Sequence, residues 1–169
     1  MKSERAMTES LEIAIGAELT QKIREHGVET YPYECCGALL GRDNALIDGP
    51  GSDPSRSRFS RCVYALFPLV NRRDDSPRNR FSLTADDVLQ AEKAARAQGL
   101  EVIGWYHSHP DHPARPSDFD RDHAWPWYSY IIVSVHKGAP QDLTSWQLKD
   151  DRSGYLEEKI ETVNVGAAS

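Results

Sequence analysis

Short apolar runs bounded by glycine, proline or polar turn residues recur along the whole chain, and this pattern is typical of β-strands. Several runs alternate apolar and polar side chains or are rich in β-branched and aromatic residues. Loops are predicted over residues 49–58 and 71–79. Strands are predicted over residues 11–15, 36–42, 44–49, 61–70, 80–83, 100–109, 128–136, 144–150 and 155–163, with a hairpin turn at 42–44.

Two segments show a helical period instead. Residues 17–27 place apolar side chains four positions apart, and Gly27 is expected to end this helix. Residues 84–99 begin at a capping residue, Thr84, and carry acidic side chains in the first turn, where they favour the positive end of the helix dipole. Strands interleaved with about two main helices predict an α/β fold with a mixed sheet.

Length and composition narrow the class of protein. A chain of 169 residues with 39% hydrophobic and 27% charged residues suits one globular domain, predicted over 10–165 after a mobile tail at 1–9. A net charge of -6 argues against nucleic acid or an anionic membrane as a partner. The longest apolar runs are too short to cross a bilayer, and the three cysteines make a poor disulfide framework. We expect a cytoplasmic protein, and a homodimer stays open.

The stretch HSHPDHPARPSDFD, residues 107–120, concentrates candidate metal ligands. On a strand, His107 and His109 point to the same face, and Pro110 is expected to end that strand. Ser117 stands three residues before Asp120, the spacing of a helix cap, so the Asp120 carboxylate is expected to project from a first helical turn. Two histidines, one carboxylate and an open fourth position match a catalytic zinc site, although the same set also holds Fe(II).

This motif, His107-Ser108-His109, seven residues, Ser117, two residues, Asp120, resembles that of the JAMM (MPN+, or Mov34/JAB) zinc metalloproteases, in their compact prokaryotic form. YPYECCGALLG at residues 31–41 is similar to the first motif of the same family and supplies an acidic residue, Glu34. The resemblance extends from about residue 11 to about residue 149. It implies a cytidine-deaminase-like single domain with a mixed β-sheet sandwiched by helices.

The resemblance also implies a role for each motif residue. His107, His109 and Asp120 would hold one Zn2+ with a catalytic water, whose pKa the metal lowers from 15.7 toward about 7. Glu34 would act as general base, and Ser117 would help to stabilise the oxyanion. Cys35, Cys36 and Cys62 are expected to serve packing rather than chemistry.

The resemblance further implies the substrate, a ubiquitin-like or sulfur-carrier protein that is cleaved at the amide bond after its C-terminal Gly-Gly to release cysteine or a conjugated target. Only about seven residues separate Asp120 from the next strand, so the insertion of the eukaryotic polyubiquitin-chain enzymes is missing. Extended glycines suit a narrow channel beside a sheet edge. Arg72 and Arg73, in the basic loop 71–80, are predicted to bind an acidic surface of the carrier.

Three alternatives remain at this point. A catalytically silent MPN-type scaffold would be expected to have lost ligands, whereas all five motif residues are present here. A RadC-like DNA-associated relative has a comparable motif, but it usually carries a glycine-bearing segment after the His-Pro pair, and the acidic composition also disfavours it. An iron oxygenase would bind iron and consume oxygen.

Overall fold

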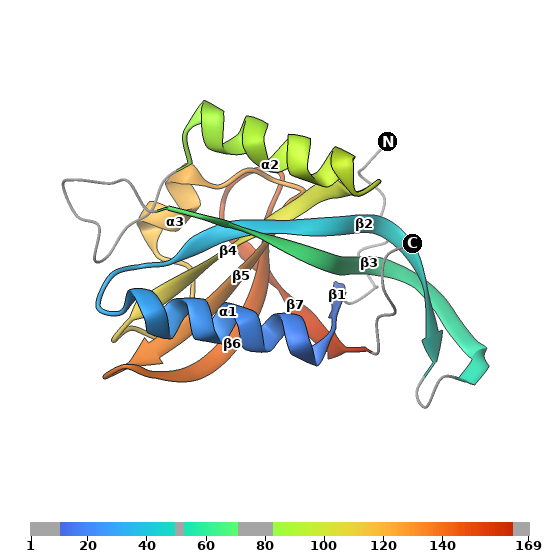
Figure 1. The fold of residues 1–169 in the computed structure, drawn as a ribbon, viewed down its shortest axis with the longest axis horizontal. Helices are drawn as coiled ribbons and strands as arrows, with labels where there is room; N and C mark the ends of the chain where they lie inside the picture. The colour runs from blue at the N-terminus through green and yellow to red at the C-terminus, as the bar shows by residue number, and fades with distance from the viewer. Residues whose placement is uncertain (1–10, 50–52, 71–82, 164–169) are drawn as a thin grey trace.

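The computed structural model describes residues 11–49, 53–70 and 83–163, which form seven strands and three helices. Figure 1 shows their arrangement and labels each of them. In chain order the elements are β1 (Glu12–Ile15), α1 (Ala17–Thr30), β2 (Cys36–Gly49), β3 (Asp53–Leu69), α2 (Ala85–Ala97), β4 (Glu101–Pro110), α3 (Asp118–His123), β5 (Ser129–His136), β6 (Ala139–Leu148) and β7 (Tyr155–Thr162).

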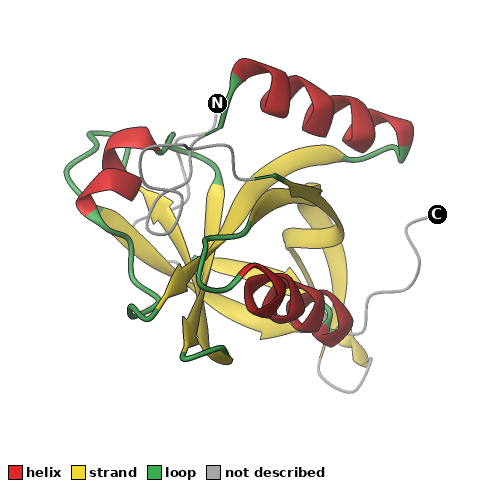
Figure 2. Ribbon diagram, turned by 60° about the vertical axis from the view of Figure 1, so that its left-hand side comes forward, coloured by secondary structure: helices red, strands yellow, loops and turns green. Residues whose placement is uncertain are grey.

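The strands form one mixed sheet in the order β1-β3-β2-β4-β5-β6-β7, and β1 also pairs with β7, so the sheet closes on itself. The pairs β1–β3, β1–β7 and β4–β5 are parallel, and the other pairs are antiparallel. Helices α1 and α2 lie on opposite sides of the strands (Figures 1 and 2). The predicted mixed sheet between helices is therefore present, and its closure was not predicted.

Strand β4 lies between two apolar cores. Alternate side chains of a strand face opposite sides, so Tyr106 packs into the cluster beside α1 while Trp105 packs into the cluster beside α2. The first cluster is built on isoleucine, leucine and valine from the strands together with Ile23 of α1. Ala91 and Ala95 of α2 join the second cluster. Buried on both faces, β4 is a rigid support for the residues at its end.

The hairpin predicted at residues 42–44 is wrong. Strand β2 continues through these residues to Gly49, and its pairing with β3 shifts register between Arg42 and Ala45. The turn-forming residues are accommodated in this irregularity, where Asp43 accepts a 2.8 Å hydrogen bond from the buried Arg61 side chain. The loop predicted over 49–58 is also wrong for its second part, because β3 begins at Asp53.

The predicted end of the first helix at Gly27 is wrong as well, since α1 continues to Thr30. A Cβ atom at Gly27 would lie 3.0 Å from Val135 and 3.3 Å from Ser108. Gly27 therefore serves a close contact between helix and sheet. Other expectations are confirmed: α2 begins at Thr84 with a capping box, and β4 ends at Pro110.

Part of the sequence prediction lies outside the described residues, namely the tail at 1–9, residues 50–52 of the first predicted loop, the loop predicted at 71–79, and residues 80–82 of the strand predicted at 80–83. Leu83, its last residue, belongs to no strand. Among the helices of the described residues, none has the length and apolar character needed to span a membrane.

Candidate metal centre

The two histidines of the motif project from the end of β4 in the way that strand geometry predicts. His107 and His109 are 1% and 8% exposed, and their Nε2 atoms lie 3.0 Å apart. Ser108, between them, is fully buried on the opposite side, where it approaches Gly27 of α1. A strand that is packed on both faces thus presents two imidazoles to one point.

Asp120 reaches the same point from α3. Ser117 caps this helix, and its side-chain oxygen accepts a hydrogen bond from the Asp120 backbone N–H at 3.1 Å. The Ser117 backbone N–H in turn donates to Asp120 Oδ2 at 2.8 Å. This reciprocal capping box holds the carboxylate at a defined place in the first turn, as the Ser-x-x-Asp spacing predicted.

The three side chains converge. Asp120 Oδ2 lies 3.1 Å from His109 Nε2, and Asp120 Oδ1 lies 3.4 Å from His107 Nε2. Ligand atoms about 2.0 to 2.1 Å from a tetrahedral zinc ion are separated from one another by about 3.3 Å. Asp120 therefore places one carboxylate oxygen near each histidine, at separations close to those between the ligands of such an ion.

Hydrogen bonding and burial prepare the histidines to bind a cation. His109 Nδ1 lies 2.8 Å from the Pro113 carbonyl oxygen, which can only accept, so a neutral His109 carries its proton on Nδ1 and offers the Nε2 lone pair. Burial lowers the pKa of His107 and favours its neutral form. Burial by itself would raise the pKa of Asp120, but the adjacent His107 and His109 outweigh it and hold that pKa well below its usual range.

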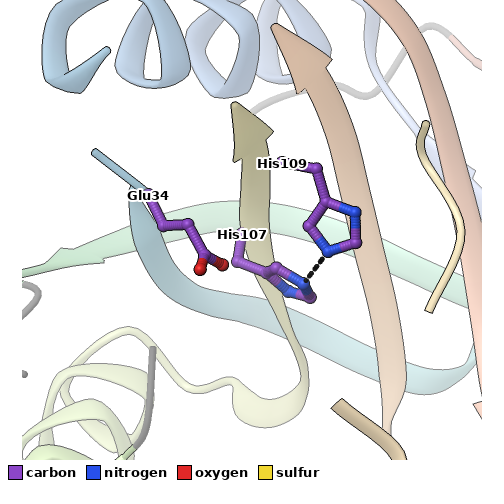
Figure 3. Close-up of side chains that lie close together, drawn as sticks. All are labelled: Glu34, His107 and His109. Carbon is purple, nitrogen blue, oxygen red and sulfur yellow. Dashed lines mark hydrogen bonds between the residues drawn. The ribbon is translucent and has the colours of Figure 1, made fainter. Parts of the chain in front are cut away.

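Glu34 completes the group from the segment between α1 and β2. Its neighbour Cys35 donates its backbone N–H to Ser108 Oγ at 2.8 Å, and the Ser108 N–H donates to the Cys35 carbonyl at 3.2 Å. These two bonds fix Glu34, which is 1% exposed, beside the histidines (Figure 3). Ligand atoms of Glu34, His107 and His109 all lie within 4.8 Å of one another.

The histidine pair thus belongs to two groups of three side chains. Asp120 is the third member of one group, and Glu34 is the third member of the other. The Asp120 oxygens, at 3.1 and 3.4 Å, are at ligand-to-ligand spacing. Glu34 also places a carboxylate oxygen within 4.8 Å of a ring nitrogen of each histidine. Two carboxylates, one from α3 and one from the segment before β2, therefore approach the same histidine pair.

An apolar pocket adjoins this centre. His107 and Asp120 line it together with Leu83, Pro116, His123, Tyr130 and Tyr155. The two tyrosines were not predicted from the sequence, because they lie in β5 and β7, where an aromatic residue ordinarily indicates packing. No local sequence pattern could have indicated that these strands border the histidine pair.

The remaining residues of interest are the three cysteines, one further histidine and the two arginines of the basic loop. The three cysteines are buried and form no disulfide, and burial raises the pKa of the Cys35 thiol to about 12, as expected of cysteines that serve packing. His26 is half-buried, and its Nδ1 lies 2.8 Å from the Tyr106 hydroxyl. Arg72 and Arg73 lie outside the described residues, so their contact with a carrier stays a prediction.

Comparison with known proteins identifies the family. The family model described as prokaryotic homologues of the JAB domain matches residues 16–149. This chain belongs to that family. The match runs from α1 through β6, and so includes Glu34, both histidines and Asp120.

Among curated relatives, a desampylase from Haloferax volcanii is 31% identical over 74% of this chain and 82% of its own length. A "probable TtuB-protein conjugate cleaving protease" from Thermus thermophilus is 29% identical over 69% of this chain and 66% of its own. The Lys-63-specific deubiquitinase BRCC36 from Rattus norvegicus is 28% identical over 56% of this chain but only 38% of its own length. These relatives confirm the prediction of a JAMM-type metalloprotease.

Solved structures agree on the fold. A protein from Desulfitobacterium hafniense is 32% identical, has a TM-score of 0.70, and is matched over 90% of this chain and 94% of its own. A JAB1/MPN domain protein from Archaeoglobus fulgidus is 18% identical with a TM-score of 0.50, over 90% of this chain and 99% of its own. At that identity the second likeness concerns the fold alone, and it confirms the predicted MPN-like architecture.

Proposed function

We propose that this protein is a zinc-dependent peptidase or isopeptidase that hydrolyses the amide bond after the C-terminal Gly-Gly of a ubiquitin-like or sulfur-carrier protein. The observation that carries the proposal is the convergence of His107, His109 and Asp120 at 3.0 to 3.4 Å, with the Glu34 carboxylate facing them. The donor set, two imidazoles and one carboxylate, suits a single catalytic Zn2+.

Each residue has a role that its position supports. Zinc, when bound, lowers the pKa of a water and polarises the carbonyl of the scissile bond. Glu34 takes up a proton from that water at its carboxylate and returns it to the leaving amine. Burial of Glu34 and His107 at 1% exposure excludes bulk water and strengthens the electrostatic interactions among these groups.

Ser117 can serve both as a helix cap and in the reaction. Its oxygen accepts the hydrogen bond from the Asp120 backbone N–H, while its own hydroxyl hydrogen remains available to donate. Ser117 is exposed, so an incoming substrate can reach it. We infer that this hydrogen bonds to the oxyanion formed at the scissile carbonyl.

The names of the relatives support a protein conjugate as the substrate: two are described as a desampylase and a conjugate cleaving protease, and a third as a deubiquitinase. The short connection from α3 to β5, residues 124–128, leaves out the insertion expected of polyubiquitin-chain enzymes. A small carrier with an extended Gly-Gly tail is therefore the substrate class that we favour.

The test is a cleavage assay on a ubiquitin-like protein extended beyond its terminal Gly-Gly by a short peptide. The zinc-loaded protein is expected to release the peptide, with cleavage ending between the second glycine and the extension. A chelator should abolish release, and added zinc should restore it. A matched substrate that ends in Ala-Ala serves as the specificity control, because only glycine passes a narrow channel freely. Release that persists after chelation would contradict the proposal.

A further inference from the structure

Helix α3, which carries Asp120, is too weakly packed to hold that residue in place by itself. It has six residues, each at least partly exposed, and only the Asp120 side chain, at 9% exposure, is largely enclosed. Isolated helices shorter than about 12 residues are marginal in water, so their stability must come from tertiary contacts. The capping box between Ser117 and Asp120 is internal to the helix and does not attach it to the rest of the protein.

The C-terminal end of α3 is held by one side chain from a distant turn. Arg152, between β6 and β7, donates from Nη1 to the Ala124 carbonyl at 2.9 Å. Its Nη2 approaches the carbonyls of Arg121 at 3.3 Å and Asp122 at 3.5 Å. A guanidinium at this position satisfies carbonyls that a helix leaves without partners, and its positive charge is favourable at the negative end of the helix dipole.

The turn that presents Arg152 is itself well defined. The Arg152 N–H donates to the Lys149 carbonyl and the Lys149 N–H to the Gly154 carbonyl, both at 2.9 Å. Arg152 adopts a φ of 62°, in the left-handed region that residues other than glycine, asparagine and aspartate seldom adopt. The protein thus maintains an unfavourable backbone conformation at the residue that holds α3.

The segment after α3 is fixed at further points, so α3 is held through this end. The Trp125 N–H donates to the Tyr130 hydroxyl at 2.8 Å. The Arg61 side chain donates to the Trp127 carbonyl at 2.6 Å and lies 4.6 Å from the centre of the Trp127 ring. Of these side chains, Arg152 bonds the residues that follow Asp120 most closely in the sequence, whereas Tyr130 and Arg61 bond residues farther along.

We propose that Arg152 is a positioning residue for the metal centre: it holds the C-terminal end of α3 and thereby keeps Asp120 at ligand distance from His107 and His109. This inference rests on the proposed zinc site. Arg152 touches neither metal nor substrate in this account, and it acts only through Asp120. Loss of an outer contact of this kind typically lowers metal affinity about 10- to 100-fold.

The experiment measures zinc affinity by competition with a chromophoric chelator, and the visible spectrum of the cobalt-loaded protein as a report on ligand geometry. Arg152→Ala keeps the Cβ atom and hence the backbone preference at a φ of 62°. It is expected to lower zinc affinity about 10- to 100-fold and to weaken the tetrahedral cobalt bands. Arg152→Lys keeps the charge but not the two-armed donor, so it should recover only part of the affinity.

Two controls separate positioning from other effects. Arg121→Ala removes the same charge from α3 itself, where the Arg121 side chain pairs with Asp118 and Asp122 at 3.7 and 3.8 Å, and it should leave zinc affinity within about threefold. Thermal melting of the metal-free variants checks that each one is folded. In an Asp120→Ala background, Arg152→Ala should cause no further loss, because both changes remove the same interaction.

The outcomes are distinct. A loss below about threefold for Arg152→Ala, an equal loss for Arg121→Ala, or a full loss for Arg152→Ala in the Asp120→Ala background would each overturn the inference and leave the proposed site intact. If Asp120→Ala itself does not change zinc affinity, the proposed ligand set is wrong.

Discussion

Alternation along β4 places His107 and His109 on the same face, and a capping box fixes Asp120 relative to Ser117. Because this geometry is local, these residues of the centre could be predicted from the sequence. Glu34 was found only through the family resemblance, since no local rule links it to a strand so far along the chain. Arg152 gave no signal, because an arginine in a polar turn is ordinarily a solvated surface residue.

The raised pKa of the Cys35 thiol leads to a prediction about its reactivity. Burial raises this pKa to about 12, so the group stays a protonated thiol at neutral pH, and only the thiolate is a nucleophile. Iodoacetamide at pH 8 should therefore not modify Cys35 in the native protein. The cleavage rate should stay unchanged after this treatment. Mass spectrometry of tryptic peptides measures the modification, with urea-unfolded protein as the positive control. Rapid alkylation with loss of activity would contradict the packing role.

The elements with strong end signals were predicted well, and those defined by tertiary contacts were not. Helices α2 and α3 carry capping boxes that the sequence shows directly. Turn-type residues misled the prediction at Gly27 and at 42–44, because the structure uses them for a close helix contact and for a register shift. A local pattern cannot distinguish these uses, since they depend on which element lies opposite.

The variant Gly104→Ala tests how closely β4, the strand that carries the histidines, is packed against β5. A Cβ atom there would lie 2.1 Å from the Ser129 carbonyl oxygen, so Gly104→Ala must push β4 away from β5. We expect the free energy of unfolding to fall by about 1 to 3 kcal/mol, as for other overpacking changes. Urea denaturation measures it. Gly154→Ala is the matched control, since nothing lies within 4 Å of its Cβ position, and the two variants should not unfold at the same urea concentration.

At the scale of the whole molecule, the class of fold was predictable but the strand order was not. Alternating strands and helices indicate a mixed sheet with helices, whereas closure depends on the pairing of β1 with both β3 and β7. That pairing brings the two ends of the described chain together and is not encoded in any short pattern. The family resemblance supplied the architecture that local reasoning lacked.

Because the proposed ligands come from β4 and α3, zinc should stabilise the whole domain. A ligand that binds only the folded state at 100 times its dissociation constant stabilises it by about 2.7 kcal/mol. For a chain of this size, that corresponds to a rise in melting temperature of roughly 5 to 11 °C. Calorimetry with and without zinc measures the shift. The double variant His107→Ala and His109→Ala should melt at the same temperature with and without zinc.

In the proposed reaction, Glu34 acts on a water at a zinc ion that is held by His107, His109 and Asp120. The variant Glu34→Gln tests this role most directly. Zinc content and peptide release from a Gly-Gly-extended carrier are measured on the same preparation, with Glu29→Gln as the control for an exposed glutamate. We predict one zinc per chain in both variants, and a rate lowered about 10²- to 10⁴-fold for Glu34→Gln alone. Full activity in Glu34→Gln, or loss of its zinc, would contradict this account.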